Sequence, residues 1–189
     1  MLERFERSDF NDIHEILESS FPRDERRDRE GQLRIFDRPE YRVLGIREEA
    51  DKNGVGACAA IMAIWEFDDF IYLEHFAVKE SMRNGGLGKK MLGEMISTFG
   101  KPAVLEVEPP EDDITRRRIA FYERNGFALN HYEYVQLAYG EDSEPVPLKI
   151  MSCPDALDEE GFIKVRNTLY RELFGVISPN KLLLDEDYK

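Results

Sequence analysis

The sequence is poor in cysteine, lacks long apolar runs and has fewer basic than acidic residues. Its two cysteines, Cys58 in an apolar segment and Cys153 beside a proline, are too few for a disulfide framework or a metal cluster. We expect a buried thiol at Cys58 and a loop thiol at Cys153. No apolar run is long enough to span a bilayer, and the N-terminal residues lack the apolar stretch of a signal peptide. These absences predict a protein of the reducing cytoplasm with no membrane segment and no metal.

The charge balance argues against a nucleic-acid partner. The chain has 39 acidic and 26 basic residues and a net charge of −13. A protein that binds phosphate backbones needs a positive surface, and this one is expected to repel them. The acidity weakly favours cationic substrates such as amines. The length of 189 residues suits one domain with a core large enough to fold alone.

Apolar periodicity and turn signals predict a chain in which strands and helices alternate. Ser8 is suited to cap a first helix, Pro22 suits the first turn of a second, and residues 51–54 are typical of a hairpin turn. The segment 102–107 is nearly all apolar, as expected for a strand buried on both faces. The expected strands are 2–6, 41–47, 55–67, 70–78, 102–107, 127–139 and 146–151, and the expected helices are 8–21, 23–36, 87–99, 112–125 and 158–174.

A glycine cluster between the strand at 70–78 and the helix at 87–99 indicates an anion site. Glycine lets the backbone approach a ligand closely, and the first N–H groups of a helix attract negative charge. The spacing excludes a P-loop, because Arg83 stands where the first glycine belongs and Lys90 where a hydroxyl residue belongs. The glycines at 85, 86 and 88 do not fit a dinucleotide fingerprint either. What remains is Arg-x-x-Gly-x-Gly, from Arg83 to Gly88.

This loop resembles the pyrophosphate loop of the GNAT superfamily of acyl-CoA-dependent N-acetyltransferases. The preceding segment 72–78, Tyr-Leu-Glu-His-Phe-Ala-Val, is similar to the strand before that loop, particularly in polyamine-acetylating members, which have a glutamate at the position of Glu74. The later segment 118–127 resembles a family helix with a Tyr-x-x-x-Gly-Phe ending, matched by Tyr122, Gly126 and Phe127. The resemblance covers roughly residues 1–152.

The resemblance implies an α/β fold of the α+β kind. Its sheet is mixed and mostly antiparallel, helices flank it, and its two central strands, here 70–78 and 102–107, splay apart. We expect residues 1–152 to form the N-acetyltransferase domain and residues 153–189 to form a helical extension packed on it. The role of that extension is open among packing, dimer formation and covering the substrate site, so a homodimer stays an alternative.

The family's co-substrate is acetyl-CoA, and the resemblance places its contacts along the strand and loop. Backbone groups of Phe76 and Val78 are expected to pair with the pantetheine arm like an added strand. Backbone amides of the loop are expected to bind the pyrophosphate, and the side chains of Arg83 and Lys89 are expected to add positive charge. The expected loop contacts are Arg83, Asn84, Gly85, Gly86, Gly88 and Lys89.

Other basic residues lie near these motifs. Lys90 is expected on a solvated helix face. One of Arg116, Arg117 and Arg118 is a candidate contact with the cofactor's phosphates, but three consecutive helical residues cannot all face one ligand. Many members have an asparagine seven residues before the tyrosine, where this chain has Thr115, and this departure puts one cofactor contact in doubt.

Acyl transfer to an amine needs a neutral nucleophile and a proton for the departing thiolate. Glu74 is the leading base, with a pKa raised by partial burial; alternatively it only orients the substrate ammonium or forms a salt bridge. His75 has the better intrinsic pKa but is expected on the opposite face of the strand. Tyr122 is expected to donate the proton to the thiolate, unless it merely packs on the core. His14 and His131 are expected at the surface.

The sequence therefore predicts an N-acetyltransferase that transfers the acetyl group directly, in a ternary complex, to a primary amine of a small molecule. A protein lysine or N-terminus is the alternative acceptor, and a wide open groove would favour it. A catalytically silent acyl-CoA-binding domain is a further alternative, against which the presence of both Glu74 and Tyr122 argues. Residues 21–29 are candidates for the acceptor wall, although a solvated helix face explains most of them.

Overall fold

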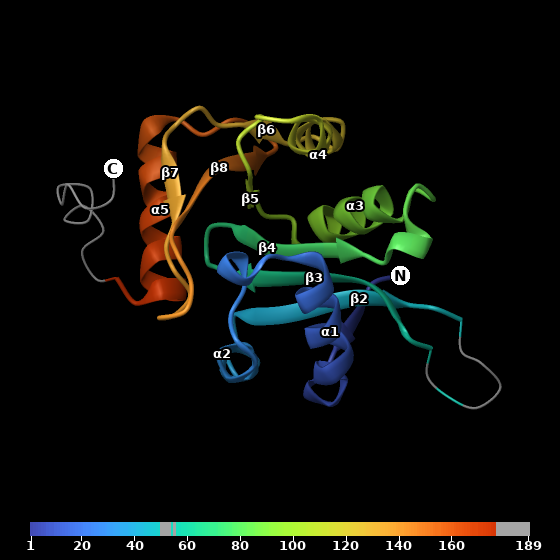
Figure 1. Ribbon diagram of the computed structural model, residues 1–189. Helices are drawn as coiled ribbons and strands as arrows, with labels where there is room; N and C mark the ends of the chain where they lie inside the picture. The colour runs from blue at the N-terminus through green and yellow to red at the C-terminus, as the bar shows by residue number, and fades with distance from the viewer. Residues whose placement is uncertain (50–53, 55, 177–189) are drawn as a thin grey trace.

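The computed structural model describes residues 1–49, 54 and 56–176. In this part of the chain, eight strands form a mixed sheet with the order β1-β2-β3-β4-β5-β8-β6, and β7 pairs with β8 (Figure 1). All neighbours are antiparallel except β4 and β5, which are parallel. The expected fold class, a mostly antiparallel mixed sheet with flanking helices, is confirmed. The strands are β1 (Glu3–Phe5), β2 (Tyr41–Arg47), β3 (Cys58–Glu66), β4 (Ile71–Val78), β5 (Ala103–Val107), β6 (Ala128–Leu129), β7 (Tyr134–Gln136) and β8 (Val146–Cys153).

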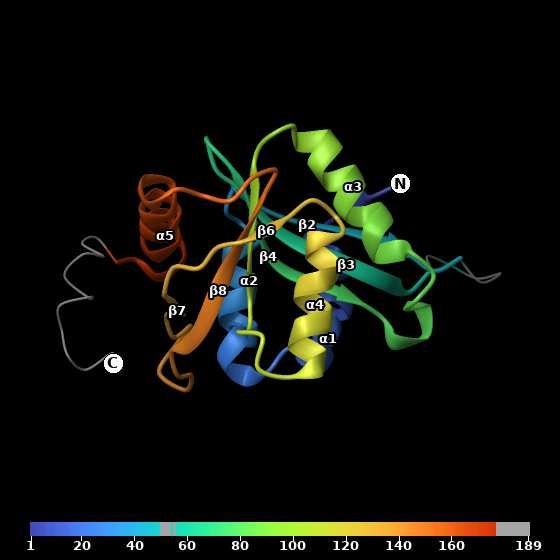
Figure 2. The same cartoon turned by 90° about the horizontal axis from the view of Figure 1, so that it is seen from above.

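Helices cover both faces of this sheet (Figures 1 and 2). On one face, α1, α2 and α5 enclose a core that includes Ile13, Trp65 and Leu169. On the other, α3 and α4 enclose a second core that includes Met91 and Met95 of α3. The helices are α1 (Phe10–Ser20), α2 (Arg29–Ile35), α3 (Leu87–Phe99), α4 (Asp113–Glu123) and α5 (Glu159–Phe174), and the short 3-10 turns are η1 (Arg7–Asp9), η2 (Arg23–Glu25) and η3 (Glu80–Met82).

The two central strands separate after a short paired stretch. β4 and β5 pair only from Ile71 with Ala103 to Leu73 with Leu105. At the next residue of β4 the register with β3 shifts: Leu73 pairs with Ile64 and His75 pairs with Ala63, which leaves Glu74 without a partner. This is a β-bulge, which bends the strand that contains the extra residue. The expected splay of the central strands is therefore present and begins at Glu74.

The helix expected over 23–36 is broken into two pieces. Arg23–Glu25 forms the turn η2, Arg26 is extended with φ −146°, and α2 begins only after Asp28, whose side chain accepts from the Gly31 backbone N–H at 2.6 Å. An aspartate at this position is a strong helix start signal. The break turns Arg27 inward, where it is buried.

Other boundaries also differ from the expectation. The helix predicted from Ser8 begins at Phe10, after η1. The strand expected over 127–139 is split into β6 and β7, and just after β6 the buried Asn130 side chain donates to Ile150 O and accepts from the Leu157 backbone N–H. Residues 51–53 of the expected hairpin turn lie outside the described residues.

Two surface assignments were wrong. His14 is buried and its ring stacks on Phe10 in α1, with 5.5 Å between the centroids. Cys153 is buried at the end of β8 and is not a loop thiol. His131 is exposed and Cys58 is buried, as predicted. None of the helices among the described residues is long and apolar enough to cross a membrane.

Helix α5 belongs to the same core as the sheet. Phe162, Val165 and Leu169 are buried in the cluster that contains Trp65, and the Tyr170 hydroxyl donates to Val135 O at 2.6 Å. A domain boundary at residues 152 and 153 stays a prediction, and residues 177–189 of the extension lie outside the described part of the chain.

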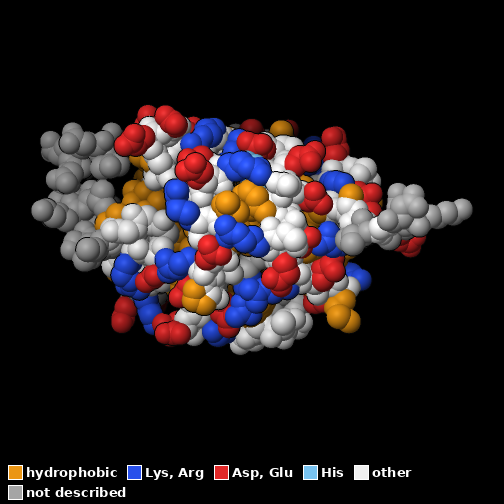
Figure 3. All heavy atoms as spheres, turned by 90° about the horizontal axis from the view of Figure 1, so that it is seen from below, with side chains coloured by type: hydrophobic (Ala, Val, Ile, Leu, Met, Phe, Trp, Pro, Cys, Tyr) orange, Lys and Arg blue, Asp and Glu red, His pale blue; other side chains and the backbone are white. Residues whose placement is uncertain are grey.

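The face of the molecule that carries α1 and α2 has no uniform charge. Figure 3 shows acidic and basic side chains interspersed over it, separated by small apolar spots. The net charge of −13 is thus not concentrated in one broad acidic surface on this side.

Candidate active site

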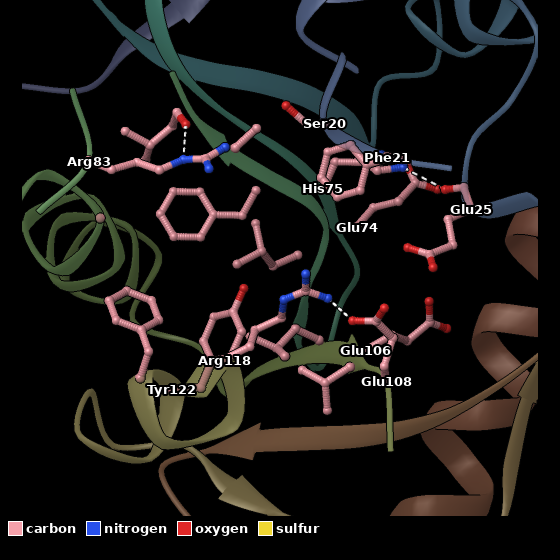
Figure 4. A pocket seen from close by; sticks show the side chains of 18 of the residues that line it. Ser20, Phe21, Glu25, Glu74, His75, Arg83, Glu106, Glu108, Arg118 and Tyr122 are labelled. Carbon is pink, nitrogen blue, oxygen red and sulfur yellow. Dashed lines mark hydrogen bonds and ion pairs between the residues drawn. The ribbon is translucent and has the colours of Figure 1, made fainter. Parts of the chain in front are cut away.

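A cavity of about 560 Å³ opens where β4 and β5 diverge. It runs from the glycine loop before α3, past the end of β5, to the turn η2, and Figure 4 shows the side chains that line it. Most of the residues predicted to contact the cofactor line it. They are Phe76, Val78, Arg83, Asn84, Gly86, Gly88 and Lys89; Glu74 and Tyr122 also line it. Gly85 is exposed and is not among the lining residues, and neither is Lys90.

The loop before α3 is shaped by two residues with left-handed backbone angles. Asn84 has φ 66° and Gly86 has φ 77°, and Gly86 is the N-cap of α3. No side chain caps this helix start. The first backbone N–H groups of α3 therefore remain available to an anion, and the helix dipole favours negative charge there. The geometry fits the pyrophosphate group of a CoA molecule.

The structure gives two loop residues roles that differ from the predicted ones. A Cβ on Gly88 would lie 3.2 Å from Phe121 Cζ and 3.4 Å from Phe76 Cζ, so this glycine lets α3 pack closely against two rings. The Arg83 Nε donates to Val78 O at 3.0 Å, so its side chain folds back over the end of β4.

Thr115 does not line the cavity, because it forms a capping box with Asp112 at the start of α4.

Glu74 does not present its carboxylate as a free base. Its side chain is completely buried and forms an ion pair with Arg27, with 2.7 Å between Oε1 and Nη1. The Tyr139 hydroxyl donates to the same oxygen at 3.1 Å, and the Arg27 guanidinium lies 4.4 Å from the centre of the Tyr139 ring. The bulge thus directs the Glu74 side chain toward Arg27 and Tyr139. Through Arg27, this buried network holds the segment between η2 and α2 in place.

The predicted raised pKa of Glu74 is wrong. Burial alone raises the pKa of a carboxyl group, but the charge of Arg27 and contacts with His75 outweigh it and lower the Glu74 pKa to about 2. A carboxylate that stays ionised at all ordinary pH values is a poor proton acceptor near neutrality. The alternative, that Glu74 closes a salt bridge, agrees with this geometry.

His75 lies on the same face of β4 as Glu74, contrary to the prediction. The bulge is the reason, because it places two consecutive side chains on one side of the strand. His75 is buried, packs edge-on against Phe21 with 4.6 Å between the centroids, and its Nε2 lies 2.9 Å from Glu25 O. A carbonyl can only accept, so Nε2 donates and His75 ties η2 to β4.

Glu106 of β5 is the carboxyl group with the properties of a general base. Its Oε2 accepts from the Tyr72 hydroxyl at 2.7 Å and its Oε1 accepts from the Tyr134 hydroxyl. Burial raises its pKa to about 7, although both tyrosine hydrogen bonds act in the opposite direction. It lines the cavity where β5 leaves β4. A proton acceptor with a pKa near neutrality is well matched to general base catalysis.

Tyr122 of α4 lines the cavity from the other face of the sheet. It belongs to the core between α3 and α4, whereas Tyr72 and Tyr134, which hold Glu106, belong to the core on the opposite face. Burial raises the pKa of Tyr122 to about 12, although Arg118 acts to lower it. The phenol is therefore protonated at neutral pH and can donate a hydrogen bond.

At one end of the cavity, hydrogen bonds tie η2 to the strands beside it. Gln136 of β7 donates from Nε2 to Asp24 O at 3.2 Å, and the Glu144 backbone N–H donates to Asp24 Oδ1 at 3.1 Å. Together with the bond from His75 to Glu25, these contacts tie η2 both to β4 and to the segment around β7 and β8. Of residues 21–29, the candidates for the acceptor wall, Phe21 and Glu25 line the cavity.

Sequence reasoning missed several residues of this site. A lone glutamate in the otherwise apolar segment 102–107 was the signal that could have identified Glu106. Arg27 and Tyr139 gave no comparable signal, because their contacts with Glu74 span 47 and 65 residues of sequence. Of the three consecutive arginines, only Arg118 lines the cavity, where it pairs with Glu108.

The comparisons with known proteins agree with this architecture. The profile of the Acetyltransferase (GNAT) family matches residues 10–127. The chain therefore belongs to this family. The expected enzyme class, an acetyltransferase with acetyl-CoA as co-substrate, is confirmed at the level of the family.

Individual relatives support the same assignment. A solved structure described as "Putative acetyltransferase from GNAT family" from Bacteroides thetaiotaomicron is 32% identical, with a TM-score of 0.81 over 93% of this chain and 99% of that one. A Bacillus subtilis protein named "Putative acetyltransferase YjbC" is 38% identical over 69 residues, which are 35% of each chain, so the match spans about a third of that relative.

More distant structures share the fold alone. The ribosomal-protein-S18-alanine N-acetyltransferase of Escherichia coli is 20% identical, with a TM-score of 0.61 over 85% of this chain and 96% of that one. The protein yncA of Salmonella typhimurium, solved with its cofactor acetyl-CoA, is 19% identical, with a TM-score of 0.56 over 84% of this chain and 95% of that one.

The buried pair predicts a large loss of stability when one partner is removed. Glu74→Leu leaves the Arg27 charge buried without a counterion and is expected to lower the free energy of unfolding by about 3–5 kcal/mol. The double variant Arg27→Leu/Glu74→Leu is expected to recover much of that loss. Urea unfolding measures both, with Glu30→Leu as control, since Glu30 forms an exposed pair with Arg34. A small loss in Glu74→Leu would show that the pair is not needed for the fold.

Proposed function

We propose that this chain transfers the acetyl group of acetyl-CoA to a primary amine of a small molecule, by direct attack in a ternary complex. The observation that carries the acceptor class is the size of the cavity, about 560 Å³, together with the hydrogen bonds that bridge its end at η2. Gln136 and Glu144 donate to Asp24, and His75 donates to Glu25, so η2 is tied to the strands beside this end. A cavity of this volume with a few convergent polar groups is typical of a small-molecule site.

In this proposal the loop and β4 hold the cofactor. Backbone N–H groups from Asn84 to Gly88, Gly85 included, and the start of α3 bind the pyrophosphate, and the Arg83 and Lys89 side chains add positive charge. Beyond Leu73 the β4 backbone has no partner on its β5 side, so Phe76 and Val78 offer backbone groups to the pantetheine amides. The acetyl group then lies in the opening between the two central strands.

In this proposal the two proton transfers take place on opposite faces of the sheet. Glu106 takes a proton from the acceptor ammonium, directly or through one water, on the face of α1, α2 and α5. The neutral amine attacks the thioester carbonyl and forms the carbon–nitrogen bond, and the nitrogen then releases its second proton to water. The tetrahedral intermediate collapses as the carbon–sulfur bond breaks. Tyr122 donates a hydrogen bond or proton to the leaving thiolate from the opposite face. Glu74 orients the site through Arg27 and does not accept the proton.

The acceptor class is tested by comparing small amines with peptides. Free thiol release from acetyl-CoA is measured with a panel of primary alkylamines, and separately with peptides that contain lysine or a free N-terminus. We expect turnover with amines and at most a trace with peptides, because the bridged end excludes a long chain. Efficient acetylation of peptides alone would overturn the proposal in favour of a protein acceptor.

The loop assignment predicts that Gly86 is required for cofactor binding. Acetyl-CoA should raise the melting temperature, because a ligand that binds only the folded state stabilises it, by about 2.7 kcal/mol at a hundred times its dissociation constant. Gly86→Val forces a branched residue into a left-handed conformation and fills the anion cradle, so the shift should disappear. Gly93→Val, on the exposed face of α3, is the control that should keep it. An intact shift in Gly86→Val would refute the loop assignment.

The proton-transfer scheme predicts a pH dependence. Because the pKa of Glu106 is raised to about 7, kcat/KM should increase with pH through about 7 as the carboxyl group loses its proton. Glu106→Gln should remove this increase of kcat/KM with pH and lower the rate by a factor of about 10²–10⁴. Tyr122→Phe should lower turnover by a similar factor but retain the increase with pH. If the increase persists in Glu106→Gln, another group is the base.

A further inference from the structure

Four carboxylates face the acceptor half of the cavity or its wall, but only two guanidinium groups lie among them. Glu74 is paired with Arg27 and Glu108 is paired with Arg118. Glu106 is held by two tyrosine hydroxyls and Glu25 has no hydrogen bond or ion pair from its carboxylate anywhere among the described residues. In the close-up, Glu25, Glu106 and Glu108 lie toward the same end of the cavity (Figure 4). Two negative groups there lack a cationic partner.

Glu25 is placed so that its backbone is fixed while its side chain is left for a ligand. Its carbonyl accepts from His75, and its N–H donates to Pro22 O at 3.2 Å. The residue is half-buried and lines the cavity, and burial raises the pKa of its carboxyl group in spite of nearby Arg118 and His75. A partly desolvated carboxylate without a partner has free energy to gain from a cation.

We infer that Glu25 is a specificity residue that binds a second positive charge on the acceptor, so that the acceptor is a diamine or another amine with an additional cationic group. This inference depends on the proposed function. One ammonium must lose its proton to Glu106 before it attacks. A second ammonium remains charged throughout, and Glu25 supplies its counterion. An amine with one nitrogen leaves Glu25 unpaired.

Neighbouring charges agree with this assignment. The groups that face Glu25 are Asp24, His75 and Arg118. Asp24 is turned toward the Glu144 backbone, and His75 donates its Nε2 hydrogen to the Glu25 carbonyl. Arg118 is already engaged with Glu108, so it neutralises one carboxylate and cannot neutralise two. The cavity end therefore remains attractive to a cation.

The test compares three acceptors of similar length, diaminobutane, butylamine and aminobutanol, in the full chain with saturating acetyl-CoA. We expect wild type to favour diaminobutane over the other two by at least about tenfold in kcat/KM, because a charge-assisted hydrogen bond to Glu25 is available to diaminobutane alone. Glu25→Gln should remove that preference through KM, by lowering kcat/KM for diaminobutane about tenfold more than for butylamine. Glu25→Asp keeps the charge and should retain most of it. Glu30→Gln, on the exposed side of α2, should behave as wild type.

The outcomes separate this inference from the proposed function. Turnover of all three amines without a preference for diaminobutane, or an equal loss for every amine in Glu25→Gln, overturns the role of Glu25 and leaves the proposed function standing. No turnover with any small amine overturns both. Acetyl-CoA binding measured by calorimetry should be the same in all variants, which shows that each one is folded. Retained binding together with a selective loss for diaminobutane supports the inference.

Discussion

The bulge at Glu74 is the constraint on which the rest of the site depends. One extra residue in β4 relative to β3 bends the strand away from β5, so the two parallel strands pair only over Ile71–Leu73. The opening that results exposes unpaired β4 backbone on one side and the end of β5 on the other. Without this irregularity β4 and β5 could continue to pair, and the cavity between them would be filled by a regular sheet.

The same bulge explains why a charged network stands behind the cavity. It places the side chains of Glu74 and His75 on one face, where they meet Arg27 and the backbone of η2. A buried ion pair is weak support for stability, since desolvation offsets much of its attraction. Its value here lies in position: Arg27 and His75 fix the segment at one end of the cavity. The helix break at Asp28, which sequence periodicity did not indicate, is what brings Arg27 inward.

Local signals were enough for most strands and helices, and the family resemblance selected the glycine loop and Tyr122, which line the cavity. Apolar alternation and helix caps act over a few residues, so most elements could be placed from the sequence within a few positions. The base could not be assigned in this way, because the pKa of a carboxyl group depends on partners that folding supplies. Folding pairs Glu74 with Arg27, which keeps the Glu74 carboxylate ionised. Folding buries Glu106 beside two tyrosine hydroxyls, and burial raises its pKa to about 7. The alternation of side chains along a strand also predicted the wrong face for His75, because a β-bulge leaves no signal in the pattern of apolar residues.

The arrangement of charges gives each carboxyl group a separate task. Where an arginine lies beside a glutamate, the pair is neutral as a whole and serves to hold backbone in place, as Arg27 does for η2. Where only tyrosine hydroxyls are present, the carboxyl group can exchange a proton, as at Glu106. Where no partner is present, as at Glu25, the charge is left for a ligand. The distinction follows from which cations the fold brings within reach, and it links the long-range contacts of β4, η2 and α4 directly to acceptor recognition.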